Sequence, residues 1–156
     1  MRISRHQMFM EMAHVAAKRA TCFRENVGCI IVRDNKVISI GYNGSPSGKE
    51  HCLYHPGGQC TEAIHAEINA LSYLNDEWFS GKYCDLYVTH LPCKDCTDTI
   101  ISSGIIRRVF FSTMYGDSEP IYQELDKDHI KLLRVMPSGA ITSHDRSELY
   151  NNVRDY

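Results

Sequence analysis

The sequence contains no long hydrophobic run, no block of like charges, no internal repeat and no low-complexity tract. No apolar stretch approaches the roughly 18 to 20 residues that a membrane-spanning helix needs. The opening stretch, MRISRHQMFMEMAHVAAKRATCF, lacks the apolar core of a secretory signal, because polar residues are spread throughout it. These absences predict a cytoplasmic protein without a membrane partner.

The chain also lacks a strong charge of either sign, with a formal net charge of −2. A protein that binds nucleic acid usually carries a broad basic surface. We therefore expect a small-molecule substrate and no nucleic-acid partner. The 156 residues, 43% hydrophobic and 23% charged, have the size and composition of one globular domain spanning residues 1–156.

Hydrophobic periodicity and turn residues predict an α/β fold. Helices are expected over residues 4–20, 61–75, 92–105 and 118–129, and strands over 27–33, 36–42, 84–91, 107–113 and 130–135. Asp34 and Asn35 join the first two strands in a hairpin, and residues 43–60 form a long loop. The polar tail after residue 135 predicts no element. This order indicates a three-layer αβα sandwich around a five-stranded mixed sheet.

The cysteines favour metal binding over disulfides. Their number, seven, is odd, and a reducing compartment disfavours disulfide bonds. Cys29 and Cys84 stand in strand-like apolar contexts and are expected to be buried thiols. The stretch PCKDC at residues 92–96 is open to four interpretations by itself: a disulfide, a redox pair, a structural metal site or a catalytic metal site.

The stretch HAE at residues 65–67 favours a catalytic metal site. His65, Cys93 and Cys96 are three ligands of the kind that zinc takes, and three protein ligands leave the fourth position open. Glu67 lies beside His65, and a carboxylate there can accept a proton from water and deliver it to a leaving group. His65 and Glu67 can both reach one cleft only if their helix begins near residues 64–67. We therefore expect this helix N-terminus and a second one at residues 92–95 to converge on the metal.

Two simpler interpretations remain open for these residues. A redox pair would need neither His65 nor Glu67. A closed structural zinc site would recruit Cys60 or Cys84 as its fourth ligand and would leave Glu67 as an ordinary helix residue. The complete pattern H-x-E…P-C-x-x-C is the signature of zinc deaminases that act on nucleobases.

Longer stretches resemble the deoxycytidylate (dCMP) deaminase family. VGCIIVRDNKVISIGYNGSPSG, HAEINAL, PCKDC and FSTMYGDSE carry the resemblance, which is strongest over residues 13–135. It implies a cytidine deaminase-like fold and the conversion of dCMP to dUMP and ammonia, which supplies dUMP for thymidylate synthesis. It also implies a homo-oligomer (a hexamer in many members), activation by dCTP and inhibition by dTTP, with Mg²⁺ carried by the triphosphate.

The resemblance also assigns substrate contacts. Asn43 matches an asparagine that contacts the nucleotide, although the dipeptide Asn-Gly favours a turn in any case. Tyr115 matches a tyrosine near the substrate and can stack on a base or simply pack. The substrate set also includes Ala66, and Arg19 and Arg24 are candidates for the 5′-phosphate or solvated surface arginines.

Two further sites rest on the resemblance. The first is an effector-nucleotide site at the glycine-containing loop, with Gly44, Ser45, Ser47, Gly48 and Lys49 as candidates, because glycine backbone can approach phosphates closely. The second is a structural zinc site, with the candidate ligands Cys22, Cys52, His55 and Cys60. These cysteines are otherwise unliganded loop thiols.

Three rival functions remain open. An adenosine deaminase acting on tRNA shares the HAE and PCxxC stretches but should present a basic surface. A deaminase of free cytidine more often has cysteine at the position of His65. An inactive deaminase-like zinc-binding module would have no need of Glu67.

Overall fold

The computed structural model describes residues 1–22, 25–49, 63–75 and 83–150. Its elements follow in chain order as α1 (Arg5–Ala17), β1 (Gly28–Arg33), β2 (Lys36–Tyr42), α2 (Ala66–Ser72), β3 (Cys84–His90), α3 (Lys94–Ser103), β4 (Ile106–Thr113), α4 (Glu119–Lys127), β5 (Lys131–Val135) and β6 (Ile141–Ser143). Every strand predicted from the sequence is present, with its ends shifted by at most one residue.

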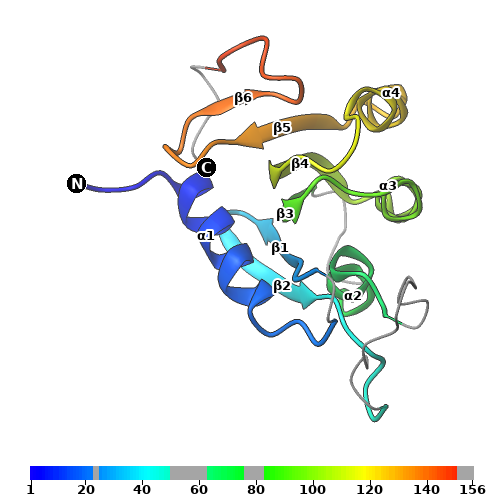
Figure 1. The fold of residues 1–156 in the computed structure, drawn as a ribbon. Coiled ribbons are helices and arrows are strands. Elements are labelled where there is room, and N and C mark those ends of the chain that lie inside the picture. The colour runs from blue at the N-terminus through cyan, green and yellow to red at the C-terminus, as the bar shows by residue number, and fades with distance from the viewer. Residues whose placement is uncertain (23–24, 50–62, 76–82, 151–156) are drawn as a thin grey trace.

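One mixed sheet organises the molecule, in the strand order β2-β1-β3-β4-β5-β6. Strands β3, β4 and β5 are parallel, and the remaining neighbours are antiparallel. Helix α1 covers one face, while α2, α3 and α4 cover the other (Figure 1). The predicted three-layer αβα sandwich is therefore confirmed.

The prediction of five strands is corrected to six. Strand β6 pairs antiparallel with β5 at the edge of the sheet, with Val135 opposite Ile141. It spans three residues, which is too short to give a readable alternation within a polar tail.

The hairpin between β1 and β2 forms as predicted. Asp34 and Asn35 have φ angles of 50° and 62°. Both therefore lie in the left-handed region that a type I′ turn requires at its two central positions, and Asn and Asp tolerate that region best after glycine.

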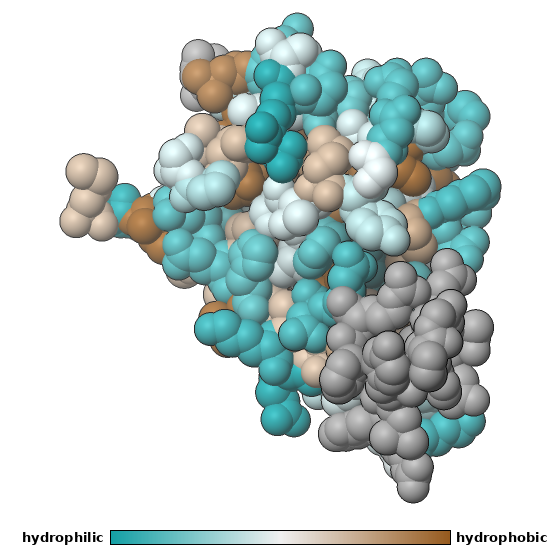
Figure 2. All heavy atoms as spheres, in the orientation of Figure 1, coloured by the Kyte–Doolittle hydropathy of each residue, from teal (hydrophilic) through white to brown (hydrophobic). Residues whose placement is uncertain are grey.

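Each face of the sheet has its own hydrophobic core. Alternate residues of β3 divide between them, because successive side chains of a strand point to opposite faces. Leu86 and Val88 belong to the core between the sheet and α2, α3 and α4. Tyr87 belongs to the other core, where it packs with Phe9 and Met10 of α1. The outer surfaces of α3 and α4 are hydrophilic (Figure 2), as expected for helices that bury one face against a sheet.

Helix α2 is shorter than the sequence pattern predicts. The pattern over residues 61–75 predicted about four turns, but the helix spans Ala66–Ser72. Ile64 cannot join it because its backbone pairs with Gly44, with N···O distances of 2.8 and 3.1 Å in the two directions. This non-local pairing ends the extended segment one residue before the helix cap and fixes where the helix begins.

No helix in the described ranges combines the length and the apolar character needed to cross a membrane.

Candidate active site

Two helix N-termini meet at the site, as the sequence predicted. His65 is the N-cap residue of α2 (φ −69°, ψ 152°), and Cys93 is the N-cap residue of α3 (φ −74°, ψ 173°). Neither side chain forms a capping hydrogen bond with its own helix. N-cap side chains normally do so, and the extended backbone here directs both side chains toward a common point instead.

The three donor atoms fit a zinc ion. Nδ1 of His65 lies 3.2 Å from Sγ of Cys96 and 3.5 Å from Sγ of Cys93. Tetrahedral zinc, with about 2.0 Å to nitrogen and 2.3 Å to sulfur, separates such a pair of ligand atoms by roughly 3.5 Å. Among the described residues, these three form the one group of histidine, cysteine and acidic side chains arranged to hold a metal.

The two cysteines are electrostatically unequal. A hydrogen bond from Cys96 is the main factor that lowers the pKa of Cys93, to about 5. The same bond, together with burial and nearby Glu67, raises the pKa of Cys96 well above the usual thiol range. Cys93, at the N-terminus of α3, is therefore the more acidic of the two thiols, and the thiolate is the form that binds metal.

Glu67 is a buried carboxylate beside the ligands. Its residue is 4% exposed, and its Oε2 lies 3.5 Å from Sγ of Cys96. Burial raises the pKa of Glu67, while its own backbone N–H and the Cys96 thiol oppose that effect. Burying a carboxylate without a cation is costly. A buried glutamate beside the metal ligands therefore suggests a role in proton transfer rather than in stability.

Strand β2 sets the position of α2. A Cβ atom on Gly41 would lie 2.2 Å from the carbonyl oxygen of Ala66 and 2.6 Å from the nitrogen of Ala70. The helix can lie this close only because the strand carries glycine there. Ser39 Oγ donates to Ala70 O at 2.6 Å, and Asn69 Nδ2 donates to Tyr42 O at 2.8 Å. The helix that carries Glu67 is thereby fixed to the sheet.

Asn43 is buried, and its side chain fixes a neighbouring segment. Its Oδ1 accepts from the backbone N–H of Val27 at 2.8 Å, and its Nδ2 donates to the carbonyl of Glu25 at 2.6 Å. The side chain thus acts as a short strand partner for residues 25–27. Its assignment to the nucleotide stays a prediction, and this bonding pattern was not readable from the sequence.

The other predicted substrate residues lie in different surroundings. Ala66 is fully buried at the first position of α2, where backbone N–H groups have no intrahelical acceptor. Tyr115 is 57% exposed, between β4 and α4. Arg19 lies with its guanidinium 6.0 Å from the centre of the Tyr42 ring. Arg24 is outside the described residues.

A groove of about 550 Å³ runs beside β2, and the glycine-containing loop lines it. Gly44, Ser45, Ser47, Gly48 and Lys49 all contribute to its wall, together with Lys18 and Arg19. The structure therefore groups Arg19 with the candidate effector residues. Of the possible second zinc ligands, Cys22 is a half-buried free thiol, while Cys52, His55 and Cys60 are outside the described residues.

Comparisons with known proteins place this chain among related deaminases. Residues 3–113 match the family described as the cytidine and deoxycytidylate deaminase zinc-binding region. ComE operon protein 2 of Bacillus subtilis is 40% identical over 128 residues, which cover 80% of this chain and 67% of that protein.

Two further relatives carry an activity in their names. Deoxycytidylate deaminase of Schizosaccharomyces pombe is 35% identical over 141 residues, which are 83% of this chain but 43% of that longer protein. The crystal structure of dCMP deaminase from the cyanophage S-TIM5, in complex with dCMP and dUMP, superposes with a TM-score of 0.71 at 27% identity. That match covers 82% of this chain and 94% of the phage chain.

Proposed function

The chain belongs to the cytidine and deoxycytidylate deaminase family, and on that basis we propose that it hydrolyses dCMP to dUMP and ammonia. The observation that carries the proposal is the buried carboxylate of Glu67, 3.5 Å from a cysteine of the three-ligand zinc site. Relatives named deoxycytidylate deaminase support dCMP as the substrate.

The chain's own residues supply the proton transfers. A zinc ion held by His65, Cys93 and Cys96 would make a water molecule nucleophilic at neutral pH. Glu67 would accept a proton from the attacking water and pass it to N3 while the water oxygen adds to C4 of the pyrimidine. It would then move the remaining proton of that oxygen to the amino group, so that the C4–N bond breaks and ammonia leaves.

The proposal predicts deamination of dCMP by the purified, zinc-loaded protein, followed by the loss of ultraviolet absorbance as cytosine becomes uracil. Deoxycytidine and a tRNA carrying unmodified adenosine serve as competing substrates in parallel. Turnover of the tRNA instead would establish the rival adenosine deaminase. Zinc binding without turnover of any of the three would indicate an inactive binding module.

We further propose that the groove beside β2 binds an effector nucleotide. Lys18, Arg19 and Lys49 supply positive charge for phosphates, and Gly48, with a φ of 82°, lets the backbone turn toward a ligand. In this proposal dCTP with Mg²⁺ activates the enzyme and dTTP inhibits it.

At subsaturating dCMP, dCTP is expected to raise the rate and dTTP to lower it. Lys49→Gln is expected to raise the effector concentration needed by about tenfold, because one charge-assisted contact is lost. Lys36→Gln, which removes a lysine at the far end of β2, is the matched control. Wild-type rates that ignore both nucleotides would dismiss the effector site and leave the deaminase proposal intact.

The remaining assignments are part of the same proposal. Asn43, Ala66 and Tyr115 contact the nucleotide, and Arg24 contributes to the binding of its phosphate. The protein is a single domain that works as a homo-oligomer, a hexamer as in many relatives, in the cytoplasm, and supplies dUMP for thymidylate synthesis. Cys22, Cys52, His55 and Cys60 bind a second, structural zinc that ties down the long loop.

A further inference from the structure

The segment of residues 114–118, between β4 and α4, begins beside the zinc ligands. The carbonyl of Thr113, the last residue of β4, accepts from the backbone N–H of Leu91 at 2.9 Å. Leu91 precedes Cys93 by two residues, a span of at most roughly 7 Å. Tyr115, the candidate substrate contact, follows Thr113 by two residues and is exposed. Where Tyr115 points therefore depends on how the other end of the segment is held.

That other end, the first turn of α4, is weakly anchored by the helix itself. Of the nine residues of α4, Leu125 alone is buried, and it lies in the second half of the helix. The N-cap residue Ser118 makes no side-chain capping hydrogen bond, although such bonds normally stabilise the start of a helix. Asp117 Oδ1 accepts from the backbone N–H of Glu119 at 3.1 Å instead. The segment and the first turn are thus joined directly, and an anchor on one acts on the other.

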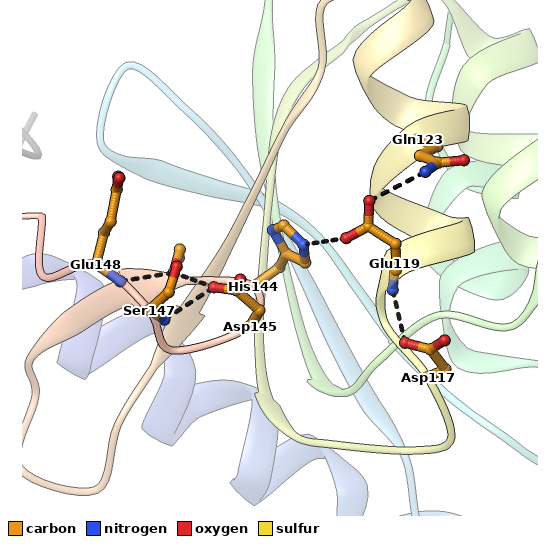
Figure 3. A network of polar contacts seen from close by, with 8 residues as sticks. Asp117, Glu119, Gln123, His144, Asp145, Ser147 and Glu148 are labelled. Carbon is orange, nitrogen blue, oxygen red and sulfur yellow. Dashed lines mark hydrogen bonds and ion pairs between the residues drawn. The ribbon is translucent and has the colours of Figure 1, made fainter.

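His144, which follows β6, holds this first turn from outside the helix (Figure 3). Its ring stacks on the Tyr122 ring with 4.1 Å between centroids and 6° between planes. Its Nε2–H donates to Oε2 of Glu119 at 3.2 Å, and Oε1 of that carboxylate accepts from Gln123 at 3.0 Å. His144 is buried, so its ring is packed between the turn that carries it and α4. It cannot swing away without losing both the stack and the hydrogen bond.

The turn that carries His144 is fixed by its own hydrogen bonds. Asp145 Oδ1 accepts from Ser143 Oγ at 2.6 Å and from the backbone N–H of Ser147 at 2.8 Å. The backbone N–H of Ser143 donates to the Glu148 carbonyl at 2.8 Å, and the backbone N–H of Glu148 donates to Ser143 Oγ at 3.0 Å. A side chain presented by such a turn is preorganised, so little conformational entropy is lost when it holds a neighbouring helix.

We propose that His144 is a positioning residue, which sets Tyr115 against the base of the nucleotide by holding the first turn of α4. The connection runs from the imidazole to Glu119, from the Glu119 backbone to Asp117, and from there along the segment. This inference rests on the proposed function and goes beyond it. The family match ends at residue 113, so His144 lies in a part of the chain to which that match assigns no role.

The first test is steady-state kinetics with dCMP. Stacking on the base acts in substrate binding as well as in the transition state, so a displaced Tyr115 should raise KM and change kcat little. His144→Ala is expected to raise KM by about tenfold, the scale of one base–aromatic stack. His144→Gln, which keeps a donor for Glu119, should recover part of this loss. Glu148→Gln is the matched control and should behave as wild type, because its side chain points away from α4 (Figure 3).

A double-mutant cycle with Tyr115→Ala separates positioning from general destabilisation. The double variant should show the KM of Tyr115→Ala alone, because His144 then has no tyrosine to position. Hydrogen exchange gives a readout that needs no substrate. In His144→Ala the amides of residues 114–118 should exchange faster, while those of β3 keep their wild-type rates. Additive effects of the two substitutions on KM, or unchanged exchange over residues 114–118, would overturn the proposal.

A second variant and a second ligand keep the test decisive. If His144→Ala does not fold in a thermal melt, Glu119→Ala breaks the same hydrogen bond from the exposed side of α4. If the protein does not deaminate dCMP, the cycle is measured on its affinity for dUMP by calorimetry. Coupling between the two substitutions there would retain the positioning role and refute the proposed function. Additive losses, or no binding of dUMP, would refute both.

Discussion

Replacing Glu67 with glutamine is expected to lower kcat for dCMP by about 10²- to 10⁴-fold, the range that one general acid–base group contributes. Glutamine has the same shape but can neither accept the proton of the attacking water nor return it to the leaving amine. Among the hydrogen bonds of the described residues, Glu67 is the carboxylate that bonds with Cys96.

The loss should appear in kcat with little change in substrate affinity, because the carboxylate acts mainly in the transition state. Zinc content, measured by atomic absorption, should stay at the wild-type level, since Glu67 is not a ligand. The thermal midpoint should stay near the wild-type value, because glutamine keeps the shape of a side chain that is 4% exposed.

Glu67→Asp provides the matched comparison, since it keeps the acid but withdraws it by one methylene from Cys96. Its rate should lie between those of wild type and the glutamine variant. A glutamine variant that retains zinc and works at the wild-type rate would remove Glu67 from the mechanism and return the chain to the class of zinc modules whose glutamate is structural.

The grouping of His65, Cys93 and Cys96 could be predicted from the sequence because its signals are local. His65 and Glu67 are two residues apart, and Cys93 and Cys96 span one helical turn, so each pair is placed by a single helix N-terminus. The turn at Asp34 is similarly local, and its strands formed as expected.

Contacts between distant segments were not readable in this way. The start of α2 depends on the pairing of Ile64 with Gly44, and β6 depends on an edge that β5 offers. The bonds of Asn43 to residues 25–27, and the convergence of His14 and Arg134 on Ser112, join residues that no periodic pattern or motif relates. Such contacts follow from the packed sheet and carry no signature along the chain.

Outside the zinc ligands and Glu67, Gly41→Ala is expected to cause the largest loss of dCMP turnover. Its new Cβ would lie 2.2 Å from the Ala66 carbonyl oxygen and 2.6 Å from the Ala70 nitrogen. Both are backbone atoms of α2, so the clash cannot be relieved by a side-chain rotation and the helix must move. Overpacking of this kind costs about 1–3 kcal/mol of stability, and sometimes more.

The moved helix carries His65 and Glu67, so the change should reach the chemistry. A displacement of about 1 Å can cost roughly a hundredfold in rate, and misplaced ligands should also weaken zinc binding. Chelator competition would measure the zinc affinity, dCMP turnover the rate, and urea denaturation the stability.

Gly28→Ala separates helix displacement from simple destabilisation. Its Cβ would lie 1.9 Å from the Ala13 carbonyl oxygen, so it forces α1 away from the opposite face of the sheet, where no zinc ligand lies. Both variants should lose stability, but Gly41→Ala alone should lose zinc affinity. Equal zinc affinity in the two would mean that α2 tilts without moving His65, and that the close approach of β2 to this helix serves the core rather than the metal.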